Sequence, residues 1–267
     1  MRSATSLAAA CAAALVLSAC GDETSLTESG PLKAPAGGAP ALALAAAPNS
    51  WTSLAPMPTS RYYHSVGVKN NAAGQPILYV FGGFDAKWDE YADRPVHLRT
   101  IELYNLATDT WTTRAGSVFA VARVNGVGRI GGKFYLPGGG TETGDGFETL
   151  RWLIVYDPTR DTWTRKADMP RPSSGGVSGV IDRKLYVLTG EEDAIEGCPD
   201  CGPSVATRRL FRYDPASDTW ASRLRCPHFH RVGAAGVIDG KLYVAGGSEP
   251  GGVVSGKLDI YDPVTNT

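Results

Sequence analysis

One phrase recurs along this chain: a tyrosine followed seven residues later by a tryptophan. It reads YNLATDTW at 104–111, YDPTRDTW at 156–163 and YDPASDTW at 213–220, and a shorter copy, YDPVTNT, begins at Tyr261. Successive tyrosines lie 52, 57 and 48 residues apart. Repeats of this length built from short strands are typical of a β-propeller, in which each repeat forms one blade. The sequence therefore predicts an all-β fold with four visible repeats.

The last copy shows how one repeat divides into strands. Residues 233–238 are small and apolar and predict the inner strand, which the tight turn Asp239-Gly240 joins to a second strand over 241–245. A third strand is predicted over 258–262, and Pro263 presets the backbone for the turn that follows it. The tyrosine and tryptophan of the phrase bracket this last turn. Because they recur in equivalent places, we expect them to pack in the core: Tyr104, Trp111, Tyr156, Trp163, Tyr213 and Trp220.

The other copies carry the same second strand, which ends in a glycine pair. The segments are ILYVFGG at 77–83, KFYLPGGG at 133–140 and KLYVLTG at 184–190, where Thr189-Gly190 replaces the pair. A glycine pair followed by a bracketing Tyr and Trp resembles the kelch repeat, and the resemblance covers the chain from residue 51 onward. It implies a kelch-type β-propeller over 51–267.

The segment WTSLAPMP at 51–58 has the sequence of the missing end of a repeat. It stands in the register of WTRKADMP at 163–170, so appending it to YDPVTNT would restore a complete phrase. One interpretation is that this segment completes the last blade and closes a four-bladed ring, which removes exposed strand edges. The alternative is that the four repeats are part of a larger propeller.

The first fifty residues have the features of an export signal and a linker. Arg2 precedes an apolar run over 7–17 that is too short to span a bilayer. The run ends in Leu17-Ser18-Ala19-Cys20, which resembles a bacterial lipobox and implies cleavage after residue 19 and lipidation of Cys20. The alternative is an ordinary signal peptide with an incidental cysteine. Residues 20–50 are rich in Ala, Gly and Pro and predict a disordered linker. We expect an exported protein anchored by lipid on the periplasmic or extracellular side of a bacterial membrane.

Composition limits the partners. The formal net charge is −1 and 20% of residues are charged, so nothing favours nucleic acid. No sequence motif indicates a cofactor.

The longer connections, those between second and third strands, indicate where a ligand would bind. They cover 84–99, 141–150, 191–208 and 248–256 and are expected at one end of the strands, together with the connections between blades. The first combines aromatic and polar side chains suited to a sugar or peptide, although these residues could instead pack locally. The candidates in it are Trp88, Asp89, Tyr91, Arg94 and His97. Three arginines recur before the inner strands and are expected either to line the channel mouth or to form ion pairs: Arg61, Arg171 and Arg231.

Three cysteines remain after residue 20. Cys198-Pro-Asp-Cys201 favours a disulfide in an exported protein, with Cys226 free or paired elsewhere. A zinc site made from Cys198, Cys201, Cys226 and His228 is the weaker alternative. His64 and His230 fall at comparable points of their repeats, which favours a structural role for both.

The leading functional hypothesis is a scaffold, without chemistry of its own, that binds a protein or a glycan. The chain has no nucleophile elbow and no HExxH helix. Because some kelch propellers are enzymes, the alternative is a carbohydrate-active enzyme resembling galactose oxidase or a sialic acid mutarotase. A copper site of the first kind requires two Tyr, two His and a Cys–Tyr crosslink, toward which Cys226, His228 and His230 are available. A third alternative is a structural envelope protein that contacts another lipoprotein.

Overall fold

The computed structural model describes residues 51–89, 94–114, 116, 122–143, 146–193 and 204–267. These residues all belong to one structural unit of the chain. Their secondary structure is almost entirely antiparallel β, with one short 3₁₀ turn, η1 (Pro250–Gly252). Within this described part, no helix is long and apolar enough to cross a membrane.

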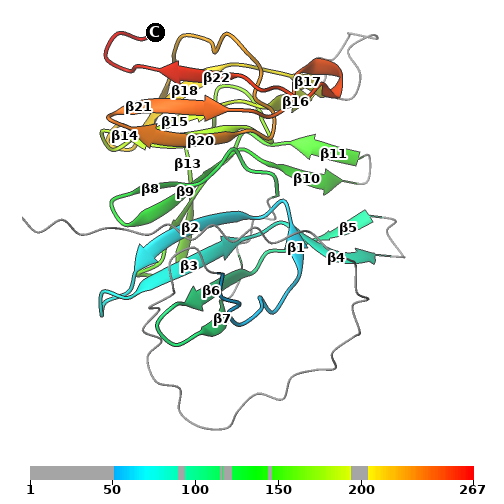
Figure 1. Ribbon diagram of the computed structural model, residues 1–267, viewed down its shortest axis with the longest axis vertical. Helices are drawn as coiled ribbons and strands as arrows, with labels where there is room; N and C mark the ends of the chain where they lie inside the picture. Colours follow the sequence, from blue (N-terminus) through cyan, green and yellow to red (C-terminus); the bar gives the residue numbers. More distant parts are fainter. Residues whose placement is uncertain (1–50, 90–93, 115, 117–121, 144–145, 194–203) are drawn as a thin grey trace, which may run out of the picture. The chain divides into compact units, whose positions relative to one another are not determined.

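Four antiparallel sheets follow one another along the chain, and each contains one copy of the repeat (Figure 1). We number them blades 1 to 4. In sheet order, their strands are β2 (Ser65–Asn70), β3 (Pro76–Phe81), β6 (Ile101–Asn105) and β7 (Thr110–Arg114) in blade 1; β8 (Gly128–Ile130), β9 (Lys133–Pro137), β12 (Leu153–Asp157) and β13 (Thr162–Lys166) in blade 2; β14 (Val177–Ile181), β15 (Lys184–Leu188), β18 (Leu210–Asp214) and β19 (Thr219–Ser222) in blade 3; and β20 (Ala234–Ile238), β21 (Lys241–Ala245) and β22 (Leu258–Tyr261) in blade 4. The predicted kelch-type β-propeller fold is confirmed.

Apolar side chains fill the spaces between neighbouring blades. The central strands read as continuous apolar runs because both of their faces are covered: all five residues of β12 are buried. One core joins blades 1 and 2 around Phe134 and Tyr156, a second joins blades 2 and 3 around Leu185 and Tyr213, and a third joins blades 3 and 4 around Leu242. Each blade is therefore held mainly by its neighbours in sequence.

The repeated phrase closes the turn between the third and fourth strands through its tyrosine hydroxyl. Each hydroxyl donates to an acceptor five residues later, and each acceptor residue has a left-handed backbone with φ between 51° and 59°. The pairs are Tyr104–Asp109 at 2.5 Å, Tyr156–Asp161 at 2.6 Å, Tyr213–Asp218 at 2.6 Å and Tyr261–Asn266 at 2.8 Å. Burial confirms the packing role predicted for the tyrosines, while Trp111, Trp163 and Trp220 are half-buried against their rings.

Residues 51–58 lie against blade 1. The backbone N–H of Ala55 donates to Asp109 at 2.8 Å, and Trp111 Nε1 donates to the Ala55 carbonyl at 2.8 Å. Ala167 makes the same two contacts with blade 3, to Asp218 and from Trp220. The predicted register of 51–58 with 163–170 is therefore right.

The predicted completion of blade 4 by this segment is wrong. Trp51 is fully exposed, and β22 has no fourth strand beside it among the described residues. All five residues of β20 are exposed, whereas a closed ring would cover this strand with the next blade. The four described blades thus do not close on one another as a four-bladed ring. The reason is local: the tryptophan and aspartate of a blade bind the segment that precedes that blade, so 51–58 is held by blade 1.

Candidate functional site

The connections expected to be long loops are mostly short β-hairpins. Each continues beyond the glycine pair of its blade, or beyond Thr189-Gly190 in blade 3, where two neighbouring extended stretches pair locally. The hairpins are β4 (Phe84–Asp89) with β5 (Arg94–His97), β10 (Gly140–Thr143) with β11 (Gly146–Thr149), and β16 (Glu191–Asp193) with β17 (Ser204–Ala206); η1 occupies this place in blade 4. We call this the hairpin end of the blades. The opposite end carries the tight turns, including the predicted turn at Asp239-Gly240, where both residues have positive φ.

Backbone hydrogen bonds join the four blades where the chain enters their first strands. One residue per blade has a left-handed backbone there, and its N–H donates to the carbonyl of the equivalent residue in the previous blade. The series runs Tyr63, Arg123, Gly175, Val232, with N···O distances of 3.0, 2.8 and 2.6 Å. A groove of about 380 Å³ beside it is lined by residues from all four blades. His64 lies in this groove, where burial and the neighbouring Arg61 lower the pKa of its imidazole.

A buried ion pair lies in the interior of blade 1, next to its hairpin end. Arg61, on β1 (Arg61–Tyr62), contacts Glu102 of β6 at 3.1 Å, and both side chains are at most 1% exposed. Arg61 also donates to the carbonyl of Gly82 at 2.9 Å. Pairing and hydrogen bonding allow this charge to be buried. Arg61 is therefore a structural residue that fixes β1 beside β4.

Next to this pair in the sheet, two exposed tyrosines pack around the buried Phe84 ring; we call the group Tyr62, Tyr63, Phe84, Val96 and His97 the aromatic patch. Tyr62 is 42% and Tyr63 47% exposed. Tyr62 stacks on Phe84 at 5.3 Å between centroids, and the His97 ring meets Phe84 edge-on at 4.4 Å. The Arg123 guanidinium lies 5.0 Å from the centre of the Tyr63 ring. Tyrosine with arginine on a rigid sheet is the composition of binding hot spots.

The residues predicted in the first connection fall around the aromatic patch. His97 is part of it. Trp88, Asp89 and Arg94 lie in the β4–β5 hairpin directly beyond, where Trp88 pairs with Pro95 and Asp89 with Arg94 along the backbone. Tyr91 lies outside the described residues. Tyr62 and Tyr63 were missed, although the adjacent tyrosines in RYYHS were a visible signal.

The other two arginines take part in ion pairs, as the second interpretation proposed. Arg231 contacts the buried Glu191 at 2.7 Å, and Glu191 also contacts Arg123 at 2.6 Å, so one carboxylate links three blades. Arg171 contacts Glu192 at 3.0 Å.

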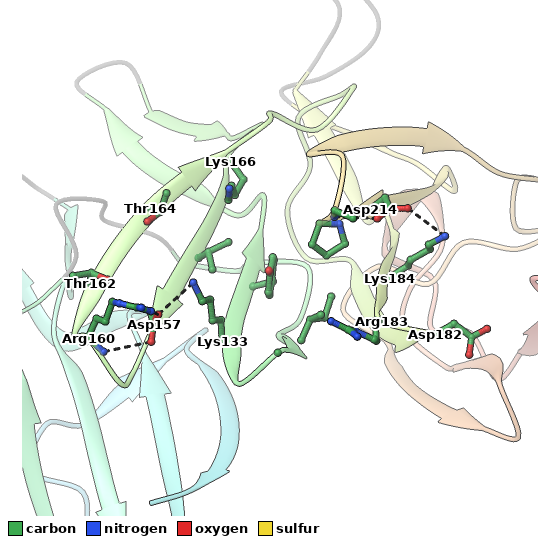
Figure 2. Close-up of a pocket in the computed structure, with 16 residues that line it drawn as sticks. Lys133, Asp157, Arg160, Thr162, Thr164, Lys166, Asp182, Arg183, Lys184 and Asp214 are labelled. Atoms are coloured by element: carbon green, nitrogen blue, oxygen red, sulfur yellow. Dashed lines mark hydrogen bonds and ion pairs between the residues drawn. The ribbon is translucent and has the colours of Figure 1, made fainter. Parts of the chain in front are cut away.

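A larger groove opens at the opposite, tight-turn end between blades 2 and 3 (Figure 2). Its volume is about 910 Å³. Five of its charged side chains form ion pairs within the groove: Asp157 contacts Lys133 and Arg160 at 3.3 and 3.0 Å, and Lys184 contacts Asp214 at 3.2 Å. Burial opposes the charged form of Asp157, but hydrogen bonds led by that from Arg160 lower its pKa to about 2. Among its described lining residues the groove has no exposed aromatic ring, so it lacks the anchor side chains that the aromatic patch offers.

The structure groups the cysteine and histidine side chains differently from the predicted zinc set. Cys198 and Cys201 lie outside the described residues, so the disulfide stays a prediction. Cys226 is free, and its neighbours are His228, His230 and Asp259 of β22. The described donor group is thus Cys226, His230 and Asp259, with a carboxylate that the predicted zinc set did not include.

His64 and His230 are not equivalent in the structure. Gly67 and Gly236 take the same place in their inner strands, since each pairs with the tyrosine of the second strand. Counting back from these glycines, the partner position of His230 is Arg61.

Comparison with known proteins agrees with this architecture. The kelch motif profile matches residues 60–116 and 233–267. The chain is 26% identical over 217 residues to mouse Kelch-like protein 35, covering 81% of this chain and 32% of that protein. It is 27% identical over 223 residues to alpha-scruin of Limulus polyphemus, covering 82% and 23% of the two chains, and 30% identical over 183 residues to rat Kelch-like protein 38, covering 67% and 26%.

The chain is therefore a kelch-repeat protein, and it spans about a third or less of the length of these relatives.

Proposed function

We propose that this protein is a kelch-repeat interaction scaffold that binds a protein partner through the aromatic patch of blade 1. The observation that carries the proposal is the exposure of Tyr62 and Tyr63 on a base fixed by the buried Arg61–Glu102 pair. Rigid, half-exposed tyrosines bury large area at little cost in side-chain entropy, so they are efficient anchors for a partner. The relatives named for their kelch repeats are consistent with a binding role.

We further propose that the scaffold is tethered to a membrane through lipid on Cys20. The support is the sequence Leu17-Ser18-Ala19-Cys20 after a short apolar run. Each methylene of an acyl chain contributes about 0.8 kcal/mol of membrane binding, so several chains together would hold the protein on the surface. Substitution Cys20→Ser is expected to release the protein into the soluble fraction and to remove the lipid mass from its N-terminal peptide. A Cys20→Ser protein that stays membrane-bound would contradict the tether.

The test of the patch uses crosslinking in membranes that contain the full-length protein. We expect Tyr62→Ser with Tyr63→Asn to weaken binding of the captured partner at least about 30-fold, as loss of two hot-spot residues does. Asn is chosen at residue 63 because it tolerates the left-handed backbone there. The matched control is Trp51→Ala, which removes a fully exposed aromatic ring outside the patch. Equal losses in both variants, or none in the first, would contradict the proposal.

A glycan ligand is the alternative that the same variants distinguish. Aromatic rings beside fixed polar groups also suit a sugar. A glycan array probed with the wild type and the Tyr62→Ser, Tyr63→Asn variant would show patch-dependent binding if the ligand is a glycan, and none if the ligand is a protein.

A further inference from the structure

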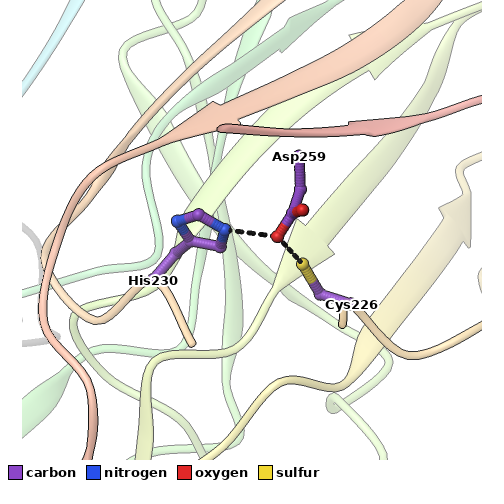
Figure 3. A group of neighbouring side chains, drawn as sticks. All are labelled: Cys226, His230 and Asp259. Atoms are coloured by element: carbon purple, nitrogen blue, oxygen red, sulfur yellow. Dashed lines mark hydrogen bonds and ion pairs between the residues drawn. The ribbon is translucent and has the colours of Figure 1, made fainter. Parts of the chain in front are cut away.

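At the hairpin end of blade 4, three side chains of different chemistry turn toward one point (Figure 3). Cys226 and His230 come from the connection between β19 and β20, and Asp259 comes from β22. The Sγ atom, an imidazole nitrogen and a carboxylate oxygen all lie within 4.8 Å of one another. The His230 side chain is fully buried and that of Asp259 is 14% exposed, so this group is part of the interior of the blade.

The hydrogen bonds of His230 fix which of its nitrogens can bind a ligand. Nδ1 lies 2.7 Å from the carbonyl oxygen of Gly246, which can only accept a hydrogen bond. Nδ1 therefore carries a proton, so Nε2 is the nitrogen left to coordinate a cation. Nε2 lies 2.8 Å from Asp259 Oδ2, a hydrogen bond that requires a proton between the two atoms and that a bound cation would replace. A histidine whose other nitrogen is held by a backbone carbonyl is the usual arrangement of a metal ligand.

One carboxylate oxygen is the meeting point of the whole group. Asp259 Oδ2 lies 3.1 Å from Cys226 Sγ and 2.8 Å from His230 Nε2. His228 Nδ1 lies 3.0 Å from both carboxylate oxygens. Because His228 Nδ1 is equally close to both carboxylate oxygens, the two oxygens together have enough lone pairs for all three partners. Cys226 Sγ, His230 Nε2 and Asp259 Oδ2 nevertheless lie within 4.8 Å of one another, close enough for one cation placed between them to bind all three.

Blade 1 shows that this place in the fold is suited to a positive charge. The equivalent positions there are Arg61 and Glu102, and Arg61 donates to Gly82 as His230 does to Gly246. In blade 1 the guanidinium supplies a permanent cation next to the carboxylate. In blade 4 a shorter imidazole and a shorter carboxylate occupy these positions, and a thiol is added.

We propose that Cys226, His230 and Asp259 bind a divalent transition-metal ion of the zinc class, with His228 orienting Asp259 from outside. Thiolate, imidazole and carboxylate are the ligands that Zn²⁺ prefers, whereas Ca²⁺ and Mg²⁺ prefer oxygen alone. Bonds of about 2.0–2.3 Å place tetrahedral donors roughly 3.3–3.8 Å apart, which requires only small shifts from the present distances. Water is expected in the fourth position. The site is independent of the aromatic patch on blade 1.

Metal analysis of the full-length protein, extracted in detergent and dialysed without chelator, tests the site. We expect about one zinc ion per chain. Titration of the chelated protein with Co²⁺ is expected to produce a thiolate-to-cobalt charge-transfer band, which requires cysteine coordination. A native protein that takes up neither ion stoichiometrically would overturn the proposal.

Variants assign the ion to these residues. Cys226→Ala, His230→Ala and Asp259→Asn are each expected to abolish the cobalt band, and His228→Ala to weaken affinity about 10–100-fold, as loss of an orienting partner does. The matched control is Cys198→Ser with Cys201→Ser, which is expected to keep the ion. Loss of the ion in that control and retention in Cys226→Ala would place the metal on the other cysteines and overturn the assignment.

A double variant separates loss of metal binding from loss of folding. His230→Arg with Asp259→Glu introduces the pair of blade 1, which brings its own cation. We expect this variant to fold without metal and to be insensitive to chelator, while chelator lowers the melting temperature of the wild type. If chelator leaves the wild type unchanged as well, the group is a structural His–Asp pair and the proposal is wrong.

Discussion

Blades 1 and 4 are the first and last of the described blades, and equivalent positions in them hold different pairs of polar residues. In both blades, a basic side chain that precedes the inner strand donates to the carbonyl oxygen of the first glycine of the pair. The same side chain contacts an acidic residue on the third strand. Blade 1 uses Arg61 and Glu102, whereas blade 4 uses His230 and Asp259. Arginine stays charged at every accessible pH, while histidine can give up its proton and coordinate a metal.

Blades 1 and 4 also differ in the turn between their third strand and the residues that follow it. Tyr104 donates to a carboxylate, that of Asp109, whereas Tyr261 donates to the amide oxygen of Asn266. Blade 1 thus relies on fixed charges at both places, and blade 4 replaces a fixed charge at each. The shared backbone tolerates this exchange because the glycine pair and the strand pairing are the same in both blades.

The largest expected effect comes from removing the acid of each pair. Glu102→Gln leaves the buried Arg61 cation without its partner, which costs about 3–5 kcal/mol of unfolding free energy. Asp259→Asn, measured in chelator, leaves an imidazole that can become neutral and keep its bond to Gly246, so we expect about 1–3 kcal/mol. Urea unfolding gives both values, with Asp168→Asn, in an exposed pair with Arg165, as the control. Equal losses would show that His230 is charged as permanently as Arg61.

Substituting the second glycine of each pair tests whether the backbones of blades 1 and 4 are equally constrained there. Gly83 and Gly247 have φ of +88° and +90°, and an added Cβ would come within 2.6 and 2.7 Å of the carbonyl oxygens of Tyr62 and Arg231. Alanine at either position is therefore expected to cost about 2–3 kcal/mol from backbone strain and this close approach. Equal shifts of the urea midpoint are the expected result. A much smaller loss in blade 4 would indicate that its edge relaxes more easily.

The loss of unfolding free energy at alkaline pH is expected to differ between the turns of Tyr104 and Tyr261. Burial first, and then the Asp109 carboxylate, raise the pKa of Tyr104 to about 12. A phenol with a raised pKa in the folded state contributes stability that is complete below about pH 10 and is lost as the pH rises toward 12. We expect Tyr104→Phe to reduce the alkaline loss by up to about 2 kcal/mol. Tyr261→Phe is expected to reduce it less, because the acceptor in blade 4 is a neutral amide. Unfolding followed from pH 8 to about 12 checks both.

The fold was predictable because its determinants repeat. The phrase from Tyr to Trp and the glycine pair located the strands closely, and β21 has the predicted bounds. The acids of the two buried pairs were also visible, since Glu102 and Asp259 each stand two residues before the repeated tyrosine.

The site was only partly predictable because its residues do not repeat. Arg61 and His230 are equivalent in space but differ in type, and finding their equivalence requires the pairing of the inner strands. Trp51 was placed in the right register but on the wrong blade, because sequence similarity identifies the segment and not the blade that holds it. The connections formed hairpins because the two strands of each pair mainly with each other, and such local pairing has a weak sequence pattern.

The smallest expected effect comes from exchanging the acceptors of the closing turns. Asp109 Oδ1 accepts from Tyr104 and from the N–H of Ala55, and Asn266 Oδ1 accepts from Tyr261 and, at 3.3 Å, from the N–H of Leu224. Hydrogen bonds to a charged acceptor are the stronger kind, so Asp109→Asn should lose about 1 kcal/mol and Asn266→Asp should gain about 0.5 kcal/mol. Urea midpoints of the two single variants and of the double exchange measure this, and because the two acceptors are on non-adjacent blades and share no hydrogen-bond partner, the two effects should add. A loss in both directions would mean that each acceptor is adapted to its own blade, and the turns would then differ in more than charge.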